Sequence, residues 1–236
     1  MRVLVIADSL AFHGPERAEL LTEPRLYPNV LAAALGAEAD VVARLGWTAR
    51  DAWFALTRDP LVYSVLLPRA DAVVLAVGSM DSVATVVPTY LREGLPLLRP
   101  EPVRRAARAA YLAAQPHAAR VSPFRALPQR LTDRYLSWCV RGIRYYHPGK
   151  PVVGVVPARH RAPAYGGTHR GHARAVAAAL AWGVRESVPL VDLPALIEPE
   201  LSAGIGNPDG MHWSWPVHER VGKAMAIVVE AACNPS

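Results

Sequence analysis

The chain has 236 residues, of which 52% are hydrophobic, so it can bury the core of one α/β domain and does not resemble a disordered chain. Its net charge is +6, and its two cysteines, Cys139 and Cys233, form neither a metal-binding spacing nor a disulfide framework. No apolar run approaches the ~20 residues of a membrane span, and the first run, 3–6, is too short for a signal peptide. These features predict a cytoplasmic protein with reduced thiols and no stable membrane insertion.

The positive charge is concentrated in one segment. Residues 92–150 carry twelve basic and three acidic side chains, a net charge of +9, whereas the rest of the chain carries −3. Such a segment predicts an anionic ligand. Nucleic acid is one candidate, but the segment has no nucleic-acid motif and no regular aromatic interleaving. We therefore expect a phosphorylated or carboxylated small molecule.

Five short β-rich runs alternate with helix-like stretches. Their hydrophobicity is continuous, which is typical of parallel strands buried on both faces. The runs cover residues 3–7, 40–43, 72–77, 151–156 and 189–193. They predict a three-layer, doubly wound α/β fold with a five-stranded parallel sheet, for which we expect the flavodoxin-like strand order 2-1-3-4-5.

Boundary residues mark three of the intervening helices. Pro28 and Gly36 lie at the two ends of a predicted helix over 29–35. A second, alanine-rich helix over 170–183 is expected to end at its glycine. Ser214 is a suitable N-cap for the last helix.

The third and fourth predicted strands are separated by more residues than one crossover requires. This stretch is rich in proline and coincides with the basic segment. We interpret residues 88–150 as an insertion of short helices that forms a lid or substrate-binding cap. Because there is no internal repeat and no low-complexity linker, residues 1–236 are expected to form a single domain.

Residues with catalytic chemistry lie near both ends of the chain. The first strand leads directly into Asp8 and Ser9, at the edge of the sheet where ligands bind in open α/β folds. Asp209 and His212 lie three residues apart before the last helix, so one turn can supply a base and its orienting carboxylate. Each piece alone is compatible with an ordinary turn or surface histidine. Together they indicate a serine nucleophile.

The second and third strands lead into glycine turns at the same edge of the sheet, with Gly46 after the second and Gly78 after the third. In this order, the four pieces resemble the sequence blocks of the SGNH (GDSL-like) hydrolase superfamily. Residues 7–10, Ala-Asp-Ser-Leu, are similar to the family's Gly-Asp-Ser-Leu block. The resemblance implies that Ser9 is the nucleophile, that Asp209 and His212 activate it, and that the N–H groups of Ser9 and Gly46 form an oxyanion hole.

One position departs from the family pattern. The third block normally reads Gly-x-Asn-Asp, with the asparagine donating to the oxyanion, but Met80 takes that place here. A thioether cannot donate a hydrogen bond, and loss of one oxyanion donor typically costs ~3–4 kcal/mol. Four interpretations are open: Ser79 or another group substitutes, the backbone N–H groups suffice, the enzyme is slow, or catalysis has been lost.

Across its whole length the chain also resembles the actinobacterial diglucosylglycerate octanoyltransferases. The resemblance rests on residues 7–14, 78–81 and 209–214. It implies transfer of an octanoyl group from acyl-CoA to a glucosylglycerate hydroxyl in methylglucose lipopolysaccharide assembly. Acyl-CoA would be a co-substrate, so no cofactor is expected. An SGNH esterase or carbohydrate deacetylase that uses water, and a catalytically inactive binding module, are the alternatives.

Substrate contacts are expected at the strand ends and in the basic segment, where arginine forks suit phosphate and carboxylate groups. We assign them to Asp8, Trp47, Gly78, Asp81, Arg104, Arg105 and Arg108. No metal site is expected, because no carboxylate cluster accompanies His160, His169 and His172.

Overall fold

The computed structural model describes residues 1–87, 89–205 and 209–234. Five parallel strands form one sheet in the order β2-β1-β3-β4-β5, which confirms the predicted doubly wound α/β fold. The strands are β1 (Arg2–Ala7), β2 (Glu38–Ala43), β3 (Ala72–Ala76), β4 (Val152–Val156) and β5 (Leu190–Asp192). Ala7 pairs with both Ala43 and Ala76, so the first three strands end at one level. Their following loops therefore share one edge of the sheet.

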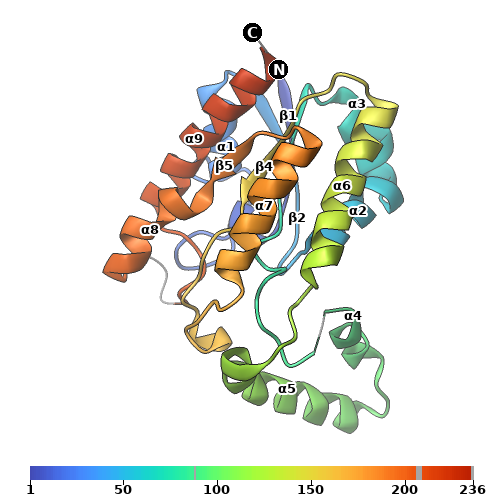
Figure 1. Cartoon of the computed structure of the whole chain (residues 1–236), viewed down its shortest axis with the longest axis vertical. Coiled ribbons are helices and arrows are strands. Elements are labelled where there is room, and N and C mark those ends of the chain that lie inside the picture. The colour runs from blue at the N-terminus through green and yellow to red at the C-terminus, as the bar shows by residue number, and fades with distance from the viewer. Residues whose placement is uncertain (88, 206–208, 235–236) are drawn as a thin grey trace.

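Helices cover both faces of the sheet (Figure 1). Alternate residues of β1 face opposite cores, Val3 and Val5 one of them and Leu4 and Ile6 the other. The first core is closed by α1 (Tyr27–Ala34), α8 (Leu193–Ala203) and α9 (Trp215–Cys233). The second is closed by α2 (Ala49–Arg58), α6 (Gln129–Tyr146) and α7 (His172–Glu186). The short elements are η1 (Ser9–Ala11), η2 (Val62–Leu66), α3 (Leu67–Arg69) and η4 (Pro163–Tyr165).

Two of the three predicted helix boundaries agree with the structure. Pro28 lies in the first turn of α1, and the Ser214 side chain caps α9 by accepting from Val217 N. The predicted end of α7 at Gly183 is wrong, since the helix continues to Glu186 and ends at Ser187 with φ of 50°. Gly183 instead allows close packing, because a Cβ there would lie 2.8 Å from the Leu190 side chain.

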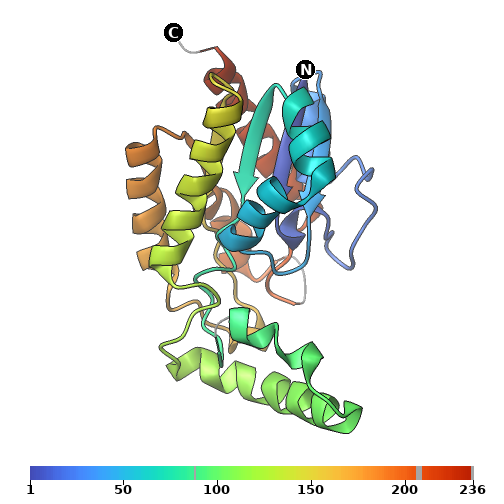
Figure 2. The same ribbon diagram turned by 90° about the vertical axis from the view of Figure 1, so that its right-hand side faces the viewer.

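The predicted insertion, residues 88–150, divides into two parts. Helix α6 packs against α2 and α7 and buries Cys139, Val140 and Ile143, so it is the crossover helix between β3 and β4. The other part, which we call the cap, comprises α4 (Thr89–Arg92), η3 (Leu95–Leu97) and α5 (Glu101–Val121). It projects beyond the carboxyl edge of the sheet (Figures 1 and 2). Pro88, the first residue of the predicted insertion, lies outside the described residues.

The Gln115 amide anchors the cap to the scaffold. Its nitrogen donates to Ala84 O at 2.8 Å and its oxygen accepts from Val86 N at 3.2 Å. The Ser122 hydroxyl donates to Thr85 O at 2.7 Å. None of the described helices, the long α5 included, has the length and apolar character needed to cross a membrane.

Candidate active site

Ser9 lies directly after β1, in the first turn of η1. Asp8 forms the N-cap of this turn, and its carboxylate accepts from Leu10 N at 3.0 Å. The backbone oxygen of Ser9 accepts from the N–H groups of Phe12 and His13. Only 3% of Ser9 is exposed, so the hydroxyl is held at the carboxyl edge of the sheet and largely shielded from water.

Ser9, His212 and Asp209 form a continuous hydrogen-bonded chain. Ser9 Oγ lies 3.0 Å from His212 Nε2, and His212 Nδ1 lies 2.5 Å from Asp209 Oδ2. The other carboxylate oxygen of Asp209 accepts from Met211 N at 2.8 Å and from His212 N at 3.0 Å. The sequence-predicted trio is thus brought together with hydroxyl, imidazole and carboxylate in the order that nucleophile activation requires. Asn207 and Pro208, which precede this turn, lie outside the described residues.

The turn at 209–212 depends on a glycine. Gly210 has φ of 68°, a conformation that L side chains rarely adopt. A Cβ there would lie 2.8 Å from the carbonyl carbon and oxygen of Arg161. Arg161 N donates to Gly210 O at 2.8 Å, so the loop after β4 supports the turn directly.

Burial and hydrogen bonding set the protonation states of the pair. Burial lowers the pKa of His212, although Asp209 partly offsets this shift. Partial burial tends to raise the pKa of Asp209, but the N–H groups of His212 and Met211 and the His212 ring outweigh it, so the pKa of Asp209 is lowered. At neutral pH, His212 is therefore a neutral base beside an ionised carboxylate.

Two further histidines support His212. The His13 ring stacks on the His212 ring, with centroids 3.6 Å apart and planes 10° apart. His13 Nδ1 lies 2.7 Å from Gly14 O. His218 is fully buried. Its Nδ1 accepts from Tyr27 N, and its Nε2 donates to His13 O. Sequence analysis assigned no role to either, because nothing in their spacing links residue 13 to residues 212 and 218.

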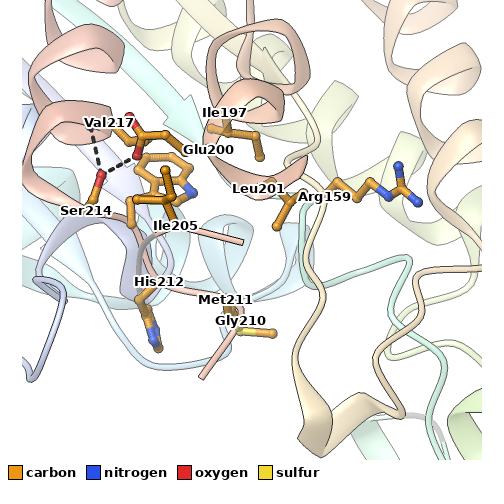
Figure 3. A pocket seen from close by; sticks show the side chains of 11 residues that line it. Arg159, Ile197, Glu200, Leu201, Ile205, Gly210, Met211, His212, Ser214 and Val217 are labelled. Atoms are coloured by element: carbon orange, nitrogen blue, oxygen red, sulfur yellow. Dashed lines mark hydrogen bonds between the residues drawn. The ribbon is translucent and has the colours of Figure 1, made fainter. Parts of the chain in front are cut away.

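A short apolar hollow lies between helix α8 and the turn at 209–212 (Figure 3). Ile197 and Leu201 of α8 line it together with Ile205 and Met211. Beside it, Ser214 donates to the Glu200 carboxylate and accepts from Val217 N. The hollow has a volume of about 40 Å³, room for only a few water molecules. The hollow is therefore too small for a substrate, and its wall includes the turn that holds His212.

A much larger groove of about 900 Å³ runs between the cap and the sheet edge. Gly46 and Met80 line it from the sheet edge, Tyr111 lines it from the cap, and Tyr165 lines it from η4. The cations in its wall are Arg92, Arg104, Arg105 and Arg108, accompanied by Glu93 and Glu101. The three arginines assigned from sequence thus lie in a groove that reaches the strand ends.

Gly46 and Met80, the two residues considered for the oxyanion hole, both line the groove, and Gly46 does not line the small pocket that contains Ser9. Gly46 has φ of 70°, and no atom lies within 4 Å of where its Cβ would be. Met80 is 8% exposed and lines both the groove and a small pocket at Ser9. The Ser79 hydroxyl accepts from Ala158 N at 2.9 Å, and it also lines that small pocket.

Four residues assigned to substrate, Asp8, Trp47, Gly78 and Asp81, do not line the groove. Both carboxylate oxygens of Asp81 accept from Ala49 N, at 2.9 and 3.0 Å, which fixes the start of α2. Gly78 has φ of 114° and shapes the turn after β3. Trp47 lies between the groove residue Gly46 and the N-cap of α2, Thr48. It lines a separate hollow with Phe54 and Arg58.

Burial also perturbs the two aspartates at the strand ends. It raises the pKa of Asp8 to about 7 and the pKa of Asp81 to about 8. Asp8 lines the small pocket at Ser9, but its carboxylate is engaged with Leu10 N. Among the described residues, no three His, Cys, Asp or Glu side chains are grouped to hold a metal ion.

Comparisons with known proteins agree with this geometry. Similar solved structures include a lipase/acylhydrolase from Enterococcus faecalis (TM-score 0.61, 17% identity, covering 98% of this chain and 96% of that one). A carbohydrate acetylesterase from Sinorhizobium meliloti also matches (TM-score 0.61, 16% identity, 98% of both chains), as does a putative SGNH hydrolase from Slackia heliotrinireducens (TM-score 0.57, 19% identity, 97% and 98%). No family model matches the chain.

The chain has the fold of the SGNH hydrolases, and within it a serine, a histidine and an aspartate form a hydrogen-bonded trio. The chain is 40% identical over 236 residues to the diglucosylglycerate octanoyltransferase of Mycobacterium tuberculosis, covering 99% of this chain and 94% of that protein. It is equally 40% identical over 233 residues to the Mycolicibacterium hassiacum protein of the same name, covering 99% and 96%. It belongs to the diglucosylglycerate octanoyltransferase family and is a serine-dependent acyltransferase.

Proposed function

We propose that the chain transfers an octanoyl group from acyl-CoA, through an acyl-Ser9 intermediate, to a hydroxyl of diglucosylglycerate or a related glucosylglycerate. The reaction would be a step of methylglucose lipopolysaccharide biosynthesis. The observation that carries the proposal is the hydrogen-bonded chain from Ser9 through His212 to Asp209. The names of the two relatives supply the acyl group and the acceptor.

The reaction proceeds in two steps at Ser9. His212 Nε2 accepts the hydroxyl proton while Ser9 Oγ attacks the thioester carbonyl, and the tetrahedral intermediate expels the CoA thiolate, which takes the proton from His212. In the second step His212 accepts the proton of a sugar hydroxyl, which attacks the acyl-serine. Collapse releases the octanoyl ester and returns the proton to Ser9. Asp209 stabilises the imidazolium formed in each step.

The groove supports an anionic donor and acceptor. Its four arginines match the phosphates of CoA and the carboxylate of a glycerate, since guanidinium groups pair with both in a bidentate manner. Its volume is within the range of sites that bind small molecules. Acyl-CoA is consumed as a co-substrate in this proposal, with no resident cofactor, which fits the proposed cytoplasmic location.

An assay with purified enzyme and octanoyl-CoA, with and without diglucosylglycerate, tests the function. We expect CoA release to require the sugar, and an octanoyl adduct on Ser9 to accumulate in intact-mass spectra when the sugar is omitted. Rapid CoA release that ignores the sugar would identify a hydrolase instead. Ser9→Ala is the control: it should abolish both the adduct and transfer, and unchanged transfer would exclude Ser9 as the nucleophile.

A further inference from the structure

A small pocket opens directly beside Ser9. Its wall includes Ser9, Met80, Met211 and His160, the last of which follows β4. Its volume of about 10 Å³ corresponds to roughly one water-sized group. The pocket is therefore of the right size for a single oxygen atom bonded to a carbon under attack by Ser9.

The loop that carries His160 is fixed on both sides of this pocket. Ala158 N donates to Ser79 Oγ at 2.9 Å, which ties the loop to the turn after β3. Arg161 N donates to Gly210 O at 2.8 Å, which ties it to the turn that holds His212. His160 thus lies between the segment containing Met80 and the segment containing the base.

The tautomer of His160 follows from its contacts. Ala162 N donates to His160 Nδ1 at 3.3 Å, so Nδ1 is an acceptor and the proton lies on Nε2. Burial lowers the pKa of His160 to about 4, so the ring stays neutral at pH 7. His160 is only 5% exposed, and among the described residues its Nε2 has no hydrogen-bond partner. A buried donor without a partner is unfavourable, and a substrate oxygen would satisfy it.

We propose that His160 is a catalytic residue whose Nε2–H donates a hydrogen bond to the acyl carbonyl oxygen as it becomes an oxyanion. This rests on the proposed role of Ser9 and supplies the side-chain donor that Met80 cannot provide. A neutral donor suits this role, because it stabilises developing negative charge without exchanging a proton with His212. The His169 ring stacks on the His160 ring, with centroids 4.3 Å apart, and makes no hydrogen bond to His160 Nε2.

Three variants test the inference. His160→Phe keeps a ring and removes the donor, whereas His160→Gln keeps an N–H donor near the position of Nε2. His169→Gln is the matched control, since it changes the stacked neighbour and keeps an amide that can hydrogen-bond to Ser82, whose Oγ lies 2.8 Å from His169 Nε2. Thermal unfolding establishes that each variant is folded.

Two readouts at Ser9 are measured by intact mass. The first is the rate of octanoyl-adduct formation at saturating octanoyl-CoA. The second is labelling by a fluorophosphonate, in which Ser9 Oγ bonds to phosphorus, fluoride leaves and the phosphoryl oxygen occupies the oxyanion position. We expect His160→Phe to slow both by about 10²–10³-fold, with His160→Gln recovering a large part and His169→Gln near wild type.

The outcomes separate the inference from the proposed function. Equal losses in His160→Phe and His169→Gln would show that the ring is structural, and normal adduct formation with slow transfer to the sugar would place His160 at the acceptor. Either result overturns the proposal. If wild-type Ser9 is labelled by the phosphonate but not by octanoyl-CoA, only octanoyl-CoA is refuted as the acyl donor. If Ser9 takes neither label, both proposals are refuted: Ser9 as the nucleophile and His160 as the hydrogen-bond donor to the oxyanion.

Discussion

At the scale of single residues, protonation of His212 controls the proposed chemistry. The base acts in its neutral form, and burial holds its pKa below the ordinary value of 6.5. A base with a lowered pKa stays neutral down to a lower pH, so the enzyme loses activity only when the pH falls below the pKa of His212. We expect the acidic limb of the kcat/KM profile for octanoyl transfer to have its midpoint below pH 6.5. A midpoint above 6.5 would contradict the assignment.

The Asp209→Asn variant is the matched test of that limb. Asp209 raises the pKa of His212, so its neutral replacement should move the midpoint to still lower pH. The rate at pH 7 should fall by about 10³–10⁴-fold, because the imidazolium formed in the reaction loses its carboxylate partner. A shift of the midpoint to higher pH would show that another group controls the limb.

Sequence reasoning identified residues whose chemistry depends on local spacing and missed those brought together only by folding. Asp209 and His212 were recognisable because three residues on one turn bring a carboxylate to an imidazole. His160 reaches the pocket at Ser9 only because β4 lies two strands from β1, and His13 meets His212 only because folding stacks their rings. No periodicity in the sequence encodes such contacts.

At the scale of elements, the tight turn at 209–212 sets the geometry of the site. Gly210→Ala should lower octanoyl transfer at least tenfold, since the new methyl group forces the turn away from the Arg161 carbonyl and moves His212. Gly36→Ala is the control: Gly36 also has positive φ, at 58°, but no atom lies within 4 Å of its Cβ position. Both variants should lose about 1–3 kcal/mol of stability through backbone strain, and only Gly210→Ala should lose activity. Equal activity losses would contradict this account.

The elements also show where sequence patterns were sufficient. The five strands were predictable because continuous apolar runs end at turns, and the parallel sheet followed from the α/β alternation. The strand order required the flavodoxin-like topology in addition. Helix α6 was grouped with the cap because its polar surface contributes to the basic segment. Its buried Val140 and Ile143 instead pack on the sheet side, a tertiary fact that charge does not reveal.

At the scale of the whole molecule, the cap concentrates positive charge over the groove. Replacing Arg104, Arg105 and Arg108 with alanine should raise the KM for octanoyl-CoA at least tenfold and weaken its salt dependence. The kcat for an uncharged octanoyl ester should change little. Arg130→Ala is the control, since Arg130 is an exposed cation of the same segment that does not line the groove. An unchanged KM in the triple variant would exclude the groove as the CoA site.

Burial of the Asp81 carboxyl group makes the free energy of unfolding depend on pH. Burial raises the pKa of Asp81 from 3.8 to about 8, so between these values the folded state keeps a proton that the unfolded state releases. The unfolding free energy therefore falls as pH rises through this window, with a slope of up to about 1.4 kcal/mol per pH unit for one proton. Asp81→Asn keeps an acceptor for Ala49 N and removes the ionisation. In urea denaturation, we expect the variant to gain stability over wild type from pH 5 to pH 8, whereas parallel curves would contradict the buried proton.

The hydrogen bond from Ser9 to His212 joins residues 203 positions apart in the chain. During synthesis the nucleophile therefore leaves the ribosome 203 residues before its base. A nascent chain lacking α9 also lacks His218, which holds the backbone of the segment after Ser9. The hydrogen-bonded trio is therefore incomplete until residue 212 has been added, and the support of His13 by His218 follows only when α9 is made.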